Sequence, residues 1–227
     1  NNIASGVKKA YPGTEVECLV SDCAEVDSCI EKISTCVEKK NLTMLVNNIG
    51  VEANDPEPYE EKTAADMKKM IGVNIEFSSL LTLRLLPNLI KNSKKHNLRS
   101  AIINLSSNAS ILNSPLLVGY TSSKEYNRSF SLTLAGEMKA LHGNLVDVLC
   151  CRPSFVESRM SGLVAHSLKG YLLGVATTEY FAKSALNKLG HVEDCSPCWK
   201  HDIASLFLIK CLCINLPIKG IWCIRAS

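Results

Sequence analysis

The sequence lacks a strong excess of charge of either sign. Its 227 residues carry a formal net charge of +3, and like charges form only short runs such as Lys39-Lys40 and Lys94-Lys95. Proteins that bind nucleic acid through its phosphates usually concentrate basic residues in one segment or on one face. We therefore expect no nucleic-acid partner.

A hydrophobic run long enough to cross a bilayer is also lacking. The longest apolar stretch, residues 203–217, contains Lys210 and is shorter than the roughly 20 residues that a membrane-spanning helix needs. The sequence begins at Asn1 without an initiating Met or a charged-then-apolar leader, so it shows no targeting signal. We expect the apolar stretch to form a buried or interfacial helix, and any leader or anchor to have been lost or never to have existed.

No repeat, low-complexity tract or Gly/Ser linker divides the chain, so we expect a single domain over residues 1–227. Apolar residues make up 46% and charged residues 21%, as in an ordinary globular protein. The eleven cysteines are odd in number and scattered, unlike the disulfide framework of a small secreted domain. We interpret them mainly as small buried side chains in a reducing compartment.

What the sequence does contain is an alternation of strand-like and helix-like segments. Short apolar runs predict buried strands at residues 16–20, 44–46, 101–105 and 145–151. Apolar residues at helical spacing predict helices at 26–37, 63–95 and 120–141, with a break or kink at Pro87. Strands that are apolar on both faces and separated by helices are typical of a doubly wound α/β fold with a parallel sheet.

This alternation stops after Pro153, and residues 154–200 have a helical and irregular pattern. Ligands of open parallel sheets bind beyond the carboxyl ends of the strands. A segment that follows a late strand is well placed to cover such a site. We expect residues 154–200 to form a substrate lid.

Several polar residues stand where this fold can use them for chemistry. Tyr120 and Lys124 are four residues apart on a predicted helix and so share a face, where an ammonium lowers the pKa of a phenol. Ser107 follows the strand 101–105, where a hydroxyl can stabilise negative charge on a carbonyl oxygen. Taken singly, a Tyr and Lys at this spacing are more often surface residues of an amphipathic helix, and a serine at a strand end is more often a turn former.

Two further polar positions stand out earlier in the chain. Asn47, Asn48 and Gly50 close the strand 44–46, where asparagine can bind backbone and glycine lets a ligand approach closely. Asn74 lies within a long predicted helix, which is an awkward place for asparagine unless it bonds backbone or water.

The order of these motifs resembles that of the short-chain dehydrogenases/reductases. The resemblance rests on NNIG at 47–50, VN at 73–74, NLSS at 104–107, YTSSK at 120–124 and RPSFVES at 152–158. It covers nearly the whole chain and implies an oxidoreductase with a Rossmann-like doubly wound parallel sheet. It also implies that the chain is missing the first βαβ segment, since none of the twelve glycines forms the GxxxGxG turn that binds the dinucleotide pyrophosphate. The chain by itself should therefore bind dinucleotide poorly.

The resemblance also implies roles for individual residues. Tyr120 would be the catalytic acid/base, and Lys124 would lower its pKa and hold the nicotinamide ribose. Ser107 would orient the substrate carbonyl, and Asn74 would order a water that links Lys124 to solvent. The other cofactor-binding residues implied are Asp22, Asn48, Gly50, Pro153, Val156 and Ser158, although Ser154 replaces the usual glycine.

Within the family, LVNNIG, LTLRLLPNLIKNSKK and CWKH at 198–201 are similar to the branch of 17β-hydroxysteroid dehydrogenases and very-long-chain 3-oxoacyl-CoA reductases. This branch implies NADP(H), a lipid-like substrate and a location at the endoplasmic reticulum membrane for the full-length protein. It is also compatible with a homodimer. The choice between steroid and acyl-CoA, and the direction of the reaction, stay open.

Two other hypotheses compete with an oxidoreductase. His191, Cys195, Cys198 and His201 have residue types that suit a structural zinc site, although their spacing matches no common zinc finger. The same fold can also serve a non-catalytic binding protein. The intact Asn, Ser, Tyr and Lys set favours an enzyme, whereas the absent glycine-rich turn favours the binding protein.

Overall fold

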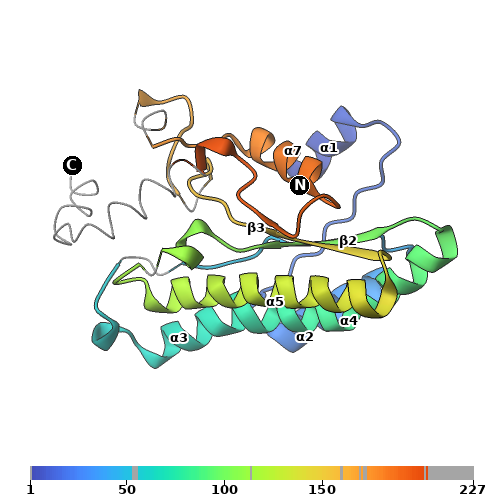
Figure 1. The fold of residues 1–227 in the computed structure, drawn as a ribbon, viewed down its shortest axis with the longest axis horizontal. Helices are drawn as coiled ribbons and strands as arrows, with labels where there is room; N and C mark the ends of the chain where they lie inside the picture. Colours follow the sequence, from blue (N-terminus) through green and yellow to red (C-terminus); the bar gives the residue numbers. More distant parts are fainter. Residues whose placement is uncertain are drawn as a thin grey trace.

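A computed structural model describes residues 2–52, 56–112, 114–158, 161–168, 170, 173–201 and 203. Its centre is a four-stranded sheet in the order β1-β2-β3-β4, with every neighbouring pair parallel. The strands are β1 (Met44–Asn47), β2 (Ser100–Leu105), β3 (Val146–Cys151) and β4 (Asp194–Cys195). The parallel sheet and the first three of these strands confirm the α/β prediction (Figure 1).

Helices connect the strands and cover the sheet. The described helices of at least eight residues are α1 (Asn2–Ala10), α2 (Val26–Val37), α3 (Ala64–Ile71), α4 (Phe77–His96), α5 (Val118–His142) and α7 (Thr178–Lys188). Shorter elements are the 3-10 helices Tyr59–Glu61 and Asn108–Ile111 and the π-helix Gly72–Glu76. Helices α2 to α5 lie on one face of the sheet and α7 lies on the other (Figure 1).

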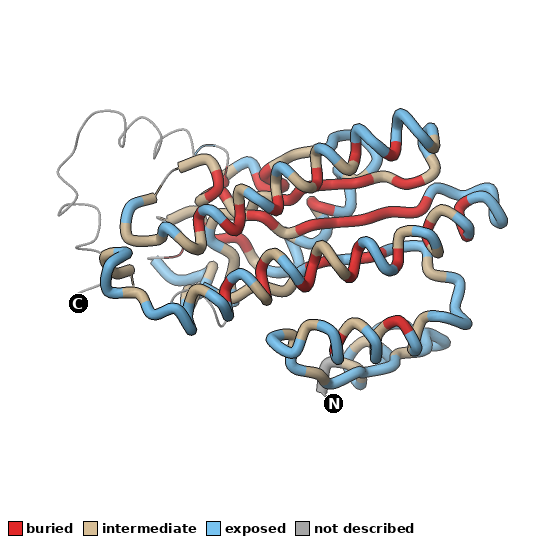
Figure 2. Tube along the Cα trace, turned by 90° about the horizontal axis from the view of Figure 1, so that it is seen from below, coloured by how far each residue is buried: buried red, intermediate tan, exposed pale blue. Residues whose placement is uncertain are grey.

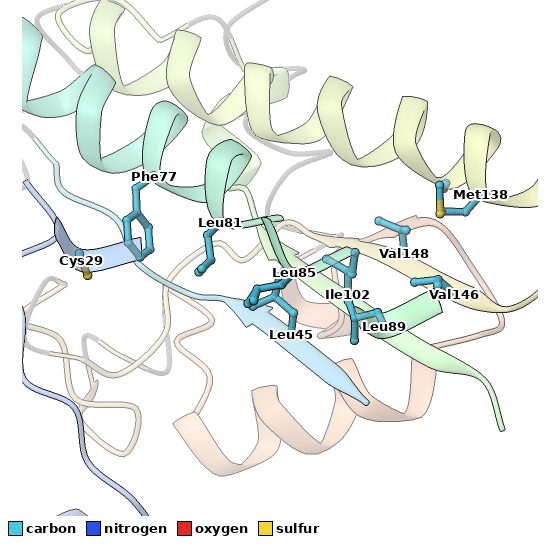
Figure 3. Packing of buried hydrophobic residues seen from close by; sticks show 11 residues of the cluster. Cys29, Leu45, Phe77, Leu81, Leu85, Leu89, Ile102, Met138, Val146 and Val148 are labelled. Atoms are coloured by element: carbon cyan, nitrogen blue, oxygen red, sulfur yellow. The ribbon is translucent and has the colours of Figure 1, made fainter. Parts of the chain in front are cut away.

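The main core lies between the sheet and helices α4 and α5. One stripe of α4 supplies leucines at helical spacing, Leu81, Leu85 and Leu89, which point toward Leu45 and Ile102 of the strands (Figure 3). Burial is concentrated on the strands and on the helix faces turned toward them, while the N-terminal part stays mostly exposed (Figure 2). Burial of apolar surface contributes about 25 cal/mol per Å² to the free energy of folding. The packing of α4 and α5 on the sheet therefore stabilises the arrangement of the strands whose ends carry the site.

The second face of the sheet is covered by α7. Ala185 and Phe181 of this helix pack on Ile103, Leu149 and Cys151 of the strands. On edge strand β1, by contrast, the residues of this face stay exposed, with Met44 40% and Val46 50% accessible. The prediction that strands are covered on both faces therefore holds for the central strands and is wrong for β1.

The expectation that the alternation stops after Pro153 is wrong. Helix α7 is followed by β4, whose Asp194 and Cys195 pair with Cys150 and Cys151. A two-residue strand carries too little pattern to be recognised, so its long-range partner decides its structure. Helix α7 and strand β4 therefore belong to the sheet and its cover. The substrate lid at residues 154–200 stays a prediction.

The strand predicted at residues 16–20 is not formed. Leu19 is 46% and Val20 92% exposed, and no strand lies beside this segment in the described part of the chain. An apolar, β-branched run becomes a strand only where a neighbouring strand supplies hydrogen bonds and a covered face. Residues 16–20 have neither.

Pro87 does not end the helix in which it lies. Helix α4 runs through it from Phe77 to His96, so no break forms there, and the alternative of a kink stays a prediction. The apolar stripe of α4 is buried before and after Pro87, at Leu85 and Leu89, and this packing offsets the loss of one helical hydrogen bond.

The structure tests the predictions for the cysteines and for the apolar stretch 203–217 only in part. Cys29, Cys150, Cys151 and Cys198 are buried thiols, as expected of small core residues, whereas Cys18 is exposed. None of the helices in the described ranges is long and apolar enough to cross a membrane. Residues 204–217 of the apolar stretch lie outside the described residues.

Candidate active site

The predicted site residues gather around the carboxyl ends of β1 and β2. Gly50 follows β1, Ser107 follows β2, and Asn74 and Lys124 approach from the helical layer on one face. Because the strands are parallel, these ends meet at one edge of the sheet, where ligands of such folds bind. The sheet thus brings together residues that are up to 74 positions apart in the chain.

Asn74 lies in the π-helix between α3 and α4 and is fully buried. Its Oδ1 accepts a bond from the Val51 amide at 2.8 Å, and its Nδ2 donates to Val51 O at 2.9 Å and to Ser123 Oγ at 3.0 Å. A π-turn widens the helix locally and is frequent at functional sites. The asparagine that seemed misplaced in a helix therefore anchors the loop after β1 to α5.

Lys124 is buried on α5, with 5% of its surface exposed. Its Nζ donates to Leu105 O at 3.1 Å, at the end of β2. At Gly50, an added Cβ would lie only 3.0 Å from Lys124 Nζ and 3.5 Å from Asn74 Oδ1. The glycine therefore leaves the space that the ammonium occupies.

Tyr120 lies one turn before Lys124, and the Lys124 Nζ is 5.8 Å from the centre of the tyrosine ring. The Ser107 hydroxyl lies close enough to the Tyr120 phenol to lower its pKa. Ser107 also caps the short helix Asn108–Ile111, since its Oγ accepts a bond from Ala109 N at 3.1 Å. The cap fixes the serine at the end of β2 with its hydroxyl against the tyrosine.

The electrostatics of the pair differ from the sequence prediction. Burial raises the pKa of Tyr120 above its ordinary value. The nearby Ser107 hydroxyl opposes this rise, and the negative charge of Glu52 adds to it. Burial also lowers the pKa of Lys124 to about 8. The ammonium thus does not bring the pKa of Tyr120 below its ordinary value in this structure, because desolvation is the larger effect on both groups.

The lowered pKa of Lys124 predicts a pH dependence of stability. Its pKa is about 8 in the folded protein and 10.5 ordinarily, so the unfolded chain binds more protons between these values. The free energy of unfolding should therefore rise with pH from about 8 to 10.5, by about 3 kcal/mol at most. Denaturant titrations of full-length wild type and Lys124→Met across this range would measure the difference.

Lys139→Met is the matched control, because Lys139 is an exposed lysine near the end of the same helix. It should keep the wild-type pH dependence, whereas Lys124→Met should lose the rise. Equal pH dependence in all three proteins would contradict a buried, destabilised ammonium.

The structure does not bring every predicted cofactor residue into this cluster. Asn48 is exposed at the end of β1. Asp22 lies in the turn before α2, where its Oδ1 accepts a bond from Ala24 N at 2.9 Å. The proposed roles of both residues in cofactor binding stay predictions.

The segment after β3 lies beside the turn that begins at Ser107. The cofactor-binding roles of Pro153, Val156 and Ser158 stay predictions. Pro153 O accepts a bond from Asn108 N at 2.8 Å, next to Ser107. Val156 forms a parallel bridge with Ala176, and Ser158 Oγ accepts a bond from Ser161 N at 3.2 Å. Pro153, Val156 and Ser158 therefore form an ordered border to the end of β3.

Sequence reasoning missed several residues that hold the site in place. Asn47 Nδ2 donates to Asn104 Oδ1 at 2.8 Å, so Asn47 joins β1 to β2. Ser106 Oγ donates to Lys124 O at 2.6 Å, and Ser123 bonds Asn74. Each lies next to a predicted residue in the sequence, so the motifs marked the right segments but not these partners.

The zinc hypothesis finds no support. Among the residues that the structure describes, no group of three or more His, Cys, Asp or Glu side chains could hold a metal ion. Both ring nitrogens of His201 instead contact backbone atoms of Ser154 and Phe155.

Comparison with known proteins agrees with this geometry. The family model of the short chain dehydrogenases matches residues 2–168. A very-long-chain 3-oxoacyl-CoA reductase of Eremothecium gossypii is 31% identical over 176 residues, 74% of this chain and 48% of the relative. One of Anas platyrhynchos is 28% identical over 203 residues, 88% of this chain and 61% of the relative. The chain thus spans about half to three-fifths of the length of these curated relatives.

Solved structures share the fold. A 7β-hydroxysteroid dehydrogenase has a TM-score of 0.73 at 18% identity, covering 93% of this chain and 82% of that one. A 3-ketoacyl-(acyl-carrier-protein) reductase from Brucella melitensis, complexed with NADH, has a TM-score of 0.63 at 23% identity and covers 89% and 78%. The sheet and its site define a doubly wound nucleotide-binding type of fold. The chain belongs to the short-chain dehydrogenase family.

Proposed function

We propose that the full-length protein is an NADP(H)-dependent oxidoreductase that interconverts a ketone and a secondary alcohol on a lipid-like substrate. The observation that carries this proposal is the meeting of Tyr120, Ser107 and Lys124 at the ends of parallel strands, with Asn74 behind them. A half-buried phenol next to a serine hydroxyl, beside a buried ammonium, is a proton-transfer arrangement. A surface Tyr and Lys on an amphipathic helix would not be enclosed in this way.

The residues present fit the ribose end of a nicotinamide nucleotide. An ammonium has three N–H donors, and Lys124 directs one of them to Leu105 O. Gly50 has no side chain beside this ammonium, and a Cβ there would crowd Lys124 Nζ. When bound, the reduced nicotinamide supplies the hydride that adds to the ketone carbon.

The protein's own part of the reaction is a proton transfer at Tyr120. Burial raises the pKa of its phenol, so at neutral pH Tyr120 carries the proton that ketone reduction must deliver to the oxygen. Ser107 orients the carbonyl with its hydroxyl, and Lys124 lies close enough to stabilise the phenolate that remains. In the reverse direction the phenolate accepts the proton of the alcohol.

The substrate class is inferred from the relatives. Proteins named very-long-chain 3-oxoacyl-CoA reductase are 31% and 28% identical to this chain, and they motivate a 3-oxoacyl-CoA as the first substrate to test. A ketosteroid is the alternative. Association with the endoplasmic reticulum membrane and a homodimer belong to the same proposal.

The test is an activity screen of the full-length protein with both substrate classes. We expect oxidation of NADPH, followed at 340 nm, with a long-chain 3-oxoacyl-CoA, and a lower kcat/KM with NADH and with a 17-ketosteroid. A higher kcat/KM with the ketosteroid would contradict the 3-oxoacyl-CoA assignment and assign a steroid substrate instead. Tight binding of NADPH with no turnover of either class would favour the non-catalytic binding protein instead.

A further inference from the structure

His201 is one of the most completely buried side chains of the described structure, with 1% of its surface exposed. Both of its ring nitrogens face the backbone just after β3. Ser154 N donates to Nδ1 at 3.3 Å, and Nε2 lies 3.0 Å from Phe155 O. Because an amide can only donate and a carbonyl can only accept, Nδ1 must be unprotonated and Nε2 must carry the hydrogen.

The main chain of His201 holds the turn after β2 as well. Its carbonyl accepts a bond from Asn108 Nδ2 at 3.4 Å. The main-chain N–H of Asn108 donates to Pro153 O at 2.8 Å, and the side-chain Oδ1 of Asn108 accepts from Arg152 Nη1 at 3.2 Å. Through these bonds His201 contacts two segments at the end of the sheet. One is the turn after β2, which begins at Ser107, and the other is the segment Ser154–Phe155 after β3.

The ring is itself held in place. The His201 amide donates to Cys198 O at 2.8 Å, and the ring lies 6.4 Å from the ring of Phe181 on α7, centre to centre. An enclosed ring with both nitrogens bonded to backbone is not available to a substrate. Its contacts are suited to fixing backbone positions.

We propose that His201 is a positioning residue that fixes the Pro153–Phe155 turn relative to the Ser107 turn. The Tyr120, Ser107 and Lys124 cluster lies beside this junction, so a loosened turn would misplace the wall against which the nicotinamide and the carbonyl must align. This inference rests on the proposed function. It adds a residue that contacts neither substrate nor cofactor and acts through the backbone of Ser154 and Phe155.

The test uses the full-length protein with three substitutions. His201→Phe keeps an aromatic ring without polar atoms, His201→Asn keeps an acceptor near the Nδ1 position, and His201→Gln keeps a donor near Nε2. We expect His201→Phe to raise the KM for NADPH and lower kcat, each about tenfold, and the two amide variants to recover part of both losses. His191→Phe is the matched control, because His191 is exposed before β4 and should leave both constants unchanged.

Two measurements do not depend on turnover. The ring ¹⁵N shifts of wild-type His201 should report the neutral form protonated at Nε2. Amide hydrogen exchange at Ser154 should be at least tenfold faster in His201→Phe than in wild type. Protonation at Nδ1, or unchanged Ser154 exchange together with unchanged KM, would overturn the proposal. If wild type turns over no ketone, the proposed function fails, while the ring and exchange data still decide whether His201 fixes the turn.

Discussion

Replacing Tyr120 with phenylalanine in the full-length protein is expected to lower kcat for ketone reduction by about 10²–10⁴-fold, the usual contribution of a positioned general acid. Tyr120 is the phenol that lies next to the Ser107 hydroxyl and 5.8 Å, ring centre to Nζ, from Lys124. Phenylalanine keeps the ring and its packing but has no proton to deliver. The KM for NADPH should change much less than kcat, and steady-state kinetics separate the two.

Tyr126→Phe is the matched control for this change. Tyr126 lies on the same helix, is 40% exposed, and its hydroxyl bonds Ser79 Oγ at 3.1 Å. Its loss should leave kcat within about twofold of wild type, since surface substitutions of this kind have small effects. Activity retained in Tyr120→Phe at the level of Tyr126→Phe would reject Tyr120 as the proton donor.

Asn74→Ala should be the most damaging single substitution for the stability of the site. The change removes three hydrogen bonds from a fully buried side chain and leaves the Val51 amide, the Val51 carbonyl and Ser123 Oγ without that partner. Each polar group left unsatisfied in a protein interior costs about 1–3 kcal/mol. Ser123 Oγ keeps its bond to Tyr120 O and Val51 is only partly buried, so we expect a loss at the lower end, about 2–4 kcal/mol in the free energy of unfolding. The loop that carries Gly50 should loosen, and kcat should fall with it.

Asn92→Ala is the control that distinguishes an effect on the site from a general loss of stability. Asn92 is a buried asparagine on α4 that makes one bond, from Nδ2 to Leu42 O at 2.9 Å. Its loss should cost about 1 kcal/mol with kcat unchanged. Denaturant unfolding and initial rates, measured on both variants, provide the comparison. An Asn74→Ala protein as stable and as active as Asn92→Ala would contradict the anchoring of the loop by Asn74.

Local pattern was sufficient for elements whose partners lie nearby in the sequence or whose apolar run is long. The helix predicted at 120–141 forms as Val118–His142, and the strand predicted at 101–105 forms as Ser100–Leu105. A four-residue spacing also places Tyr120 and Lys124 on one face of a helix without any knowledge of the fold.

Local pattern was misleading where a distant partner decides the structure. Residues 16–20 have the composition of a strand but no neighbouring strand in the described part of the chain, and they form no strand and stay mostly exposed. The two residues of β4 carry almost no pattern, yet they pair with β3 because Cys150 and Cys151 present a free edge there. Strand formation depends on hydrogen bonds to another segment, which periodicity does not encode.

The sequence by itself determined the fold class, the family and the segments that carry the site, because periodicity and motif order are properties of the chain. Only the tertiary structure decided how these groups behave. Desolvation, a property of the packed interior, raises the pKa of Tyr120 and lowers that of Lys124. The contacts of Asn74 with Val51 and of His201 with Ser154 join residues 23 and 47 positions apart, and folding alone brings such atoms within hydrogen-bonding distance.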